Sequence, residues 1–168
     1  MKADARRTAY HEAGHSVFGL QYCPLVVAKI WSARPLEDTD LLHARLVAGD
    51  CTVHGFPKNP KLKASLAWSG LVSETRLEFG AIDVRQVLAT VGRGPVIAFL
   101  SDADRKGVES IPKPERRIAL KEAAKVVEEG WALVERVAEM LIAEYQRTRA
   151  YAWVTANRAG DCSLAEPE

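Results

Sequence analysis

The sequence predicts a mainly helical α+β domain with a small β-sheet or hairpin near its N-terminus. Three observations support this fold class. Apolar residues recur at helical spacing over residues 4–22, 61–78 and 114–149. A Val- and Ile-rich run over residues 25–32 is typical of a strand. The length of 168 residues, 48% hydrophobic and 27% charged, suits one globular domain.

The N-terminal third is expected to form a helix followed by strands. Asp4 is placed to cap a helix that runs to about Tyr22, and the Cys-Pro pair at residues 23–24 ends it. The strand over residues 25–32 follows. Residues 41–48 and 51–56 then flank the Gly-Asp pair at 49–50, and this pattern predicts a β-hairpin.

The remaining chain is expected to be helical. Pro60 suits the first position of a helix over residues 61–78, and shorter helices are expected over 82–91 and 95–103. A Pro-rich linker over 110–114 precedes a long helix over 114–149, with a bend at Gly130. We expect a single domain over residues 1–157 and a disordered tail over 158–168.

Charge and cysteine content exclude several classes of function. The net charge of +1 gives no support for binding to nucleic acid or to an anionic membrane. No signal peptide or membrane-spanning run is recognisable, so we expect a soluble, cytoplasmic protein. The three cysteines are an odd number and widely spaced, which argues against a disulfide framework. For Cys51 and His54, a small buried thiol and a surface imidazole are preferred over half of a metal site.

Residues 11–15, His-Glu-Ala-Gly-His, carry the strongest chemical signal. His11 and His15 lie about one helical turn apart and project from one face, where they can hold one zinc ion. Glu12 lies close enough to reach a water in the open coordination position and take its proton. The alternative is a pair of ordinary helix-face histidines. Gly14 favours the zinc site, because it costs about 1 kcal/mol of helix stability relative to Ala and would admit a neighbouring element.

A catalytic zinc ion needs a third protein ligand. The spacing of residues cannot choose this ligand, because it can come from anywhere in the chain. The candidates by residue type are Glu74, Glu78, Asp83, His43 and His54.

The segment over residues 7–17 resembles the start of the peptidase domain of the FtsH family, the M41 zinc metallopeptidases. Residues 25–35 look like the short strand after the motif helix of that family. Residues 69–74 resemble its small-Gly-x-x-Ala-Glu helix, with Ser73 where alanine is usual. Residues 80–87 resemble its segment with a zinc-binding aspartate, with Ile82 in place of the usual asparagine. Residues 123–142 are similar to its late long helix, so the resemblance spans about residues 7–144.

The resemblance implies that His11, His15 and Asp83 are the zinc ligands and that Glu12 is the general base. It places Glu74 near the site, where it could hold one imidazole through its other ring nitrogen. A plain helix N-cap remains the alternative role for Asp83, and a solvated helix carboxylate the alternative for Glu74.

The expected function is therefore that of a zinc metalloendopeptidase, with Zn²⁺ as cofactor and a peptide or an unfolded protein as substrate. FtsH proteases also carry an ATP-driven unfoldase, but residues 91–95 lack the lysine and hydroxyl of a phosphate-binding loop. A separate ATPase would be the partner needed for folded substrates, and a homo-oligomer remains open.

Two other functions compete with this expectation. One is a non-proteolytic, zinc-containing regulatory or partner-binding module of the same fold, which would not need Glu12. The other is a protease that cleaves a repressor, disfavoured because no basic recognition helix is found.

Overall fold

The computed structural model describes residues 2–32, 47–82, 84, 85, 87 and 101–165. These residues form five helices and four strands. In chain order the elements are α1 (Lys2–Leu20), β1 (Leu25–Ser32), β2 (Val47–Val53), α2 (Pro60–Phe79), α4 (Asp102–Glu109), α5 (Lys113–Glu129), α6 (Trp131–Thr148), β3 (Tyr151–Asn157) and β4 (Cys162–Leu164). The predicted mainly helical α+β class is confirmed.

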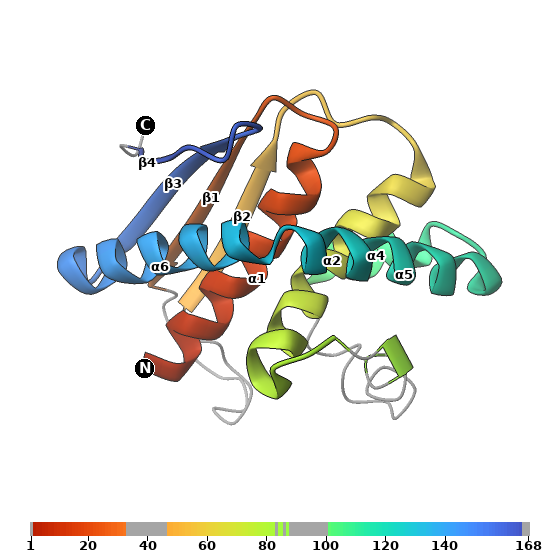
Figure 1. Ribbon diagram of the computed structural model, residues 1–168, viewed down its shortest axis with the longest axis horizontal. Coiled ribbons are helices and arrows are strands. Elements are labelled where there is room, and N and C mark those ends of the chain that lie inside the picture. The colour runs from red at the N-terminus through yellow and green to blue at the C-terminus, as the bar shows by residue number, and fades with distance from the viewer. Residues whose placement is uncertain (1, 33–46, 83, 86, 88–100, 166–168) are drawn as a thin grey trace.

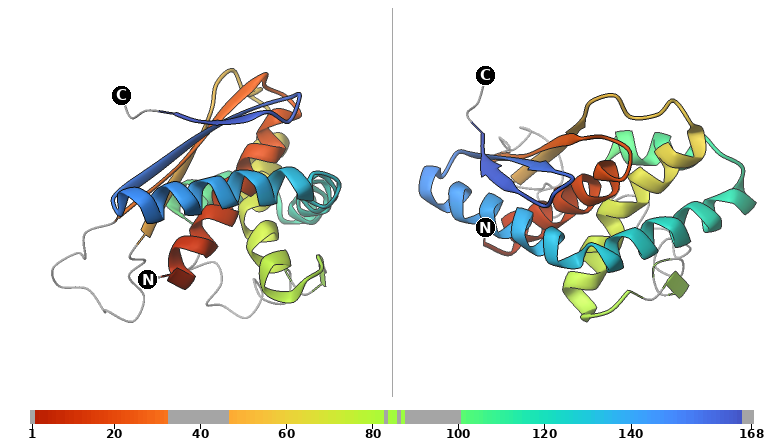
Figure 2. Two further views of the ribbon diagram at one scale, coloured as in Figure 1. Left: turned by 60° about the vertical axis from the view of Figure 1, so that its left-hand side comes forward. Right: turned by 45° about the horizontal axis from the view of Figure 1, so that its top comes forward.

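The strands form one antiparallel sheet in the order β2-β1-β3-β4. Side chains along a strand alternate between the two faces, and one face of this sheet is buried. The buried residues of that face include Val26, Ala28 and Ile30 of β1, and Ala152, Val154 and Ala156 of β3. Helices α1 and α6 pack against this face, and the strands lie together on one side of them (Figures 1 and 2).

Helix α1 lies between the sheet and α2, and every residue from Thr8 to Leu20 is buried. A Cβ atom at Gly14 would overlap the Ser73 side chain and the Ser69 carbonyl of α2. Glycine at this position therefore allows α2 to pack directly on α1, which explains its presence in the middle of a helix. Helix α2 packs in turn against α4 and α5.

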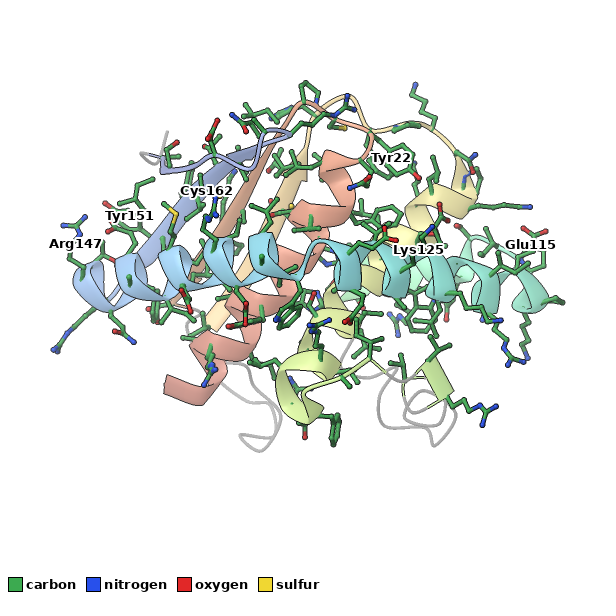
Figure 3. All side chains as sticks on the ribbon, in the orientation of Figure 1. Tyr22, Glu115, Lys125, Arg147, Tyr151 and Cys162 are labelled. Carbon is green, nitrogen blue, oxygen red and sulfur yellow. The ribbon has the colours of Figure 1, made fainter. Side chains whose placement is uncertain are left out.

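Helices α5 and α6 run end to end across the molecule. Glu115 near the start of α5 and Arg147 near the end of α6 lie at opposite ends of the long axis (Figure 3). The bend expected at Gly130 is a full break between the two helices. A Cβ atom at Gly130 would meet the Val17 side chain, so glycine there allows α1 to pass close by.

The predicted hairpin turn at Gly49 and Asp50 is wrong. Strand β2 runs through both residues, which pair with Ile30 and Lys29 of β1. Glycine at position 49 leaves room for the side chain of Glu12, because a Cβ atom there would lie 2.5 Å from the Glu12 Oε1 atom. Residues 33–46, which include most of the first predicted strand of that hairpin, lie outside the described residues.

One helix start also differs from the prediction. Asp4 lies inside the first turn of α1, which begins at Lys2. Of the helix expected over residues 95–103, only residues 101–103 are described. There Ser101 precedes α4, which begins at Asp102 and ends at Glu109, and its side chain accepts a hydrogen bond from the Asp104 N–H and caps the helix. Residues 88–100, and most of the helix expected over 82–91, lie outside the described residues.

The tail expected to be disordered is ordered through residue 165. Strand β4 pairs with β3, and the Asn157 side chain accepts a hydrogen bond from the Asp161 N–H in the turn between them. Arg158 in the same turn donates hydrogen bonds to the carbonyls of Leu20, Gln21 and Cys23 at the end of α1. These contacts order a polar segment that has little apolar surface of its own to bury. None of the helices described here is long and apolar enough to span a membrane.

The Arg158 contacts predict a measurable contribution to stability. Replacement of Arg158 by alanine removes a cation that binds the carbonyl end of α1, and should lower the free energy of unfolding by about 1 kcal/mol. Urea unfolding of the two proteins measures this difference. Arg158→Lys keeps the positive charge but loses the several N–H donors of the guanidinium group. The free energy of unfolding of this variant should lie between those of the wild type and Arg158→Ala. An unchanged urea midpoint for Arg158→Ala would show that the contact contributes nothing.

Candidate metal centre

Three buried side chains converge between α1 and α4. His11 and His15 come from α1, and Asp104 comes from the first turn of α4. The Nε2 atoms of the two histidines lie 3.0 Å apart. Asp104 Oδ2 lies 3.2 Å from His11 Nε2, and Asp104 Oδ1 lies 3.4 Å from His15 Nε2. Three potential ligand atoms thus face one small space.

These separations fit a zinc ion. Four ligands in a tetrahedron with bonds of about 2.0–2.1 Å lie about 3.3–3.4 Å from one another. Two imidazole nitrogens and one carboxylate oxygen also match the donor set of catalytic zinc sites that keep one position open. Within the described part of the chain, this is the one group of three or more His, Cys, Asp or Glu residues arranged to hold a metal ion.

The outer nitrogens of both imidazoles are bound to acceptors. His11 Nδ1 lies 2.6 Å from Glu74 Oε1, and His15 Nδ1 lies 2.8 Å from the Leu66 carbonyl oxygen. The Leu66 carbonyl and the ionised Glu74 carboxylate can only accept hydrogen bonds, so each Nδ1 atom carries the hydrogen. Each Nε2 atom then directs its lone pair into the space between the two histidines and Asp104. Two lone pairs 3.0 Å apart repel unless a proton or a metal ion lies between them.

The electrostatics of the metal-free cluster favour a positive charge. Burial opposes protonation of His11, but the carboxylates of Asp104 and Glu74 outweigh it and raise the pKa of His11 to about 10. Burial alone would raise the pKa of Asp104, yet the two adjacent imidazoles hold it far below its ordinary value. The cluster therefore binds a proton strongly when no metal is present, and a divalent cation would replace that proton.

Glu12 lies beside this cluster, with its carboxylate against Gly49 of β2. Its side chain is buried, and burial raises its pKa, although the two histidines act in the opposite direction. Among the described residues, none forms a hydrogen bond with this carboxylate. A carboxylate with a raised pKa is better suited to accept a proton near neutral pH than an ordinary surface glutamate.

The residues predicted from the sequence as candidates for the third ligand differ in their positions relative to the two histidines. Glu74 lies next to His11 and also forms an ion pair with Arg7. Glu78 and His54 are exposed and do not join the cluster. Asp83, the third ligand that the resemblance implies, lies outside the described residues, as does His43.

Asp104 is the site residue that sequence reasoning missed. It is separated from His11 by 93 residues, and none of the sequence segments that resemble the FtsH family includes it. The Ser-x-x-Asp pattern over 101–104 signals a helix N-terminus, which could have located α4 but not its contact with the histidines.

Cys51 belongs to no metal-binding cluster formed by the described residues. Its Sγ atom lies 3.4 Å from the Ser16 hydroxyl oxygen, and burial raises the pKa of the thiol. A protonated thiol is a poor zinc ligand. The predicted surface imidazole is confirmed for His54, which is exposed, whereas the thiol expected to be buried is only partly buried.

No protein-family model matches this sequence, and a search of curated proteins gives no match either. The similarity to FtsH-type peptidases stays a prediction that rests on the sequence segments quoted for it.

Paired substitutions can identify the third ligand. We expect wild-type protein to bind about one zinc ion per chain, as a single three-ligand site requires. Asp104→Asn should weaken zinc binding by more than about 100-fold, the upper range for loss of a residue that only supports a ligand. Asp83→Asn should retain the metal. Metal analysis after dialysis measures both, and the opposite pattern would transfer the third-ligand role to Asp83.

Proposed function

We propose that this protein is a zinc-dependent endopeptidase in which His11, His15 and Asp104 hold the metal and Glu12 is the general base. The observation that carries the proposal is the convergence of those three buried side chains beside the carboxylate of Glu12, which lies on α1 with both histidines. The donor set and the distances support zinc, and the adjacent carboxylate supports hydrolysis.

Each residue has a role that follows from its position. Zinc bound at this site would lower the pKa of a water molecule and polarise the scissile carbonyl group. Glu12 accepts the proton of the attacking water at its carboxylate and transfers it to the amine that leaves. Glu74 and the Leu66 carbonyl hold the two imidazoles in orientation through their Nδ1–H groups.

The substrates that suit this proposal are flexible peptides or unfolded proteins. A separate ATPase is a possible partner for the cleavage of folded substrates, which would have to be unfolded first. A cytoplasmic location is part of this proposal.

The burial of the site favours a second candidate function. His11, Glu12 and His15 are only 4%, 6% and 7% exposed. A closed zinc site stabilises a fold without catalysis, which would suit a regulatory or partner-binding module. The carboxylate of Glu12 argues for the peptidase, since a structural site needs no general base.

The peptidase proposal predicts a specific effect of Glu12→Gln. The amide cannot accept a proton, so cleavage of unfolded casein should fall at least about 100-fold, while the zinc content stays unchanged. A gel assay with purified, zinc-loaded protein measures the cleavage. Equal cleavage by both proteins would overturn the role of Glu12 as the general base. No cleavage by either protein across a range of pH would favour the regulatory module.

Gly49→Ala should reduce activity through Glu12 alone. The new Cβ atom would lie 2.5 Å from Glu12 Oε1 and 2.7 Å from its Cγ atom, so the carboxylate must move. Misplacement of a catalytic group by about 1 Å can lower the rate about 100-fold. Zinc content should remain normal in this variant.

The neighbouring substitution Ala48→Ser provides the control, because its side chain points to the opposite face of β2. It should cleave casein at the wild-type rate. Wild-type activity in Gly49→Ala would show that the position of Glu12 against β2 is unimportant.

A further inference from the structure

The Asp104 carboxylate is held by a residue that does not itself face the histidines. Ser101 lies immediately before α4, and its hydroxyl oxygen is 2.8 Å from Asp104 Oδ2. The same oxygen is 3.1 Å from the Asp104 backbone nitrogen, whose N–H it accepts. The hydroxyl therefore acts twice: it accepts from the backbone of residue 104 and donates to its side chain.

The donated hydrogen bond matters because of where Asp104 lies in its helix. An acidic side chain three residues after an N-cap serine commonly turns back to accept the N–H of the capping residue. Here Oδ2 binds the hydroxyl instead and lies 3.2 Å from His11 Nε2, while Oδ1 faces His15 Nε2.

The backbone of α4 is positioned separately. A Cβ atom at Gly107 would lie 3.0 Å from the Ala67 Cβ atom, so the absence of a side chain allows α4 to pack closely on α2. Gly107 lies one turn after Asp104. This packing places the backbone of Asp104 but does not fix the torsions of its side chain. Ser101 contacts the carboxylate from outside the cluster of His11, His15 and Asp104 and restricts these torsions.

We propose that Ser101 is a positioning residue of the metal centre, and that its hydroxyl holds the Asp104 carboxylate toward His11 and His15. The inference rests on the proposed function, because it assumes that Asp104 is a zinc ligand. It adds a residue that supports the carboxylate ligand, as Glu74 and Leu66 support the two imidazoles.

A purely structural role for Ser101, as the N-cap of α4, makes a different prediction. Glycine is tolerated at an N-cap almost as well as serine but has no hydroxyl, whereas alanine is a poor N-cap. Threonine supplies both the acceptor and the donor. Glycine, alanine and threonine at position 101 therefore separate helix capping from orientation of the carboxylate.

The experiment measures zinc affinity by competition with a chromogenic chelator, using the full chain. Ser101→Gly and Ser101→Ala should both weaken zinc binding by about 10-fold, within the range for loss of a partner that supports a metal ligand. Ser101→Thr should bind as the wild type does. Thermal unfolding of the metal-free proteins shows the capping effect alone, and there only the alanine variant should be clearly less stable.

Ser110→Ala provides a matched control. This serine lies at the other end of α4, where its hydroxyl binds the Gly107 carbonyl at 2.7 Å and does not contact Asp104. Zinc affinity should be unchanged in this variant. Any loss of helix stability caused by a missing serine hydroxyl would appear here as well.

The outcomes distinguish the two proposals. Wild-type affinity in Ser101→Gly, or a loss of affinity that follows thermal stability across the variants, would overturn the positioning role and leave the metal centre intact. Failure of the wild-type protein to bind zinc would overturn the metal centre and the role of Ser101 together. Weak binding in both the glycine and alanine variants, with rescue by threonine, is the result that supports the inference.

Discussion

The close packing of α1 against α2 determines the geometry of the site. A Cβ atom at Gly70 would lie 2.6 Å from His11 Cε1, so the imidazole rests directly on the backbone of α2. Leu66 and Glu74 lie one turn before and one turn after Gly70, on the same face of the helix. The close packing of His11 on Gly70 thus also places the Leu66 carbonyl beside His15 and the Glu74 carboxylate beside His11.

The charges around the site can be balanced by protons or by a metal ion. Among the described residues, Asp104 and Glu12 are acidic groups close to the two imidazoles, and Glu74 also pairs with Arg7. Buried carboxylates without compensation are costly, and protonated imidazoles can compensate them only by losing their metal-binding lone pairs. A divalent ion compensates both carboxylates while the imidazoles remain neutral. Metal binding at this site would therefore release protons from the imidazoles.

Local patterns predicted the parts of the site that are local. The spacing of four between His11 and His15 placed them on one helical face, and the β-branched run from Leu25 to Ser32 matched β1 at both ends. The same kind of reasoning failed at Gly49, where a glycine that suggested a turn instead makes room for Glu12 in a strand. Turn formation and close packing both select glycine, and sequence spacing does not separate them.

Contacts between distant segments could not be predicted in this way. Asp104 is 93 residues from His11, and no pattern near it in the sequence indicates this contact. Strand β3 pairs with β1, which lies more than 100 residues earlier in the sequence, and no local pattern indicates this pairing either. The position of Glu74 was indicated by a resemblance, and its hydrogen bond to His11 became visible only once α2 was placed against α1.

The long sequence separation of Asp104 from the histidines also bears on how the protein folds. Two ligands come together as soon as α1 forms, whereas the third requires closure of a long loop with its entropic cost. A zinc ion bound to all three is a cross-link between α1 and α4, and its binding free energy opposes separation of these helices. Undocking of α4 and weakening of the metal site become one event. Occupancy of the proposed site by a metal ion would then indicate that α4 has docked on α1.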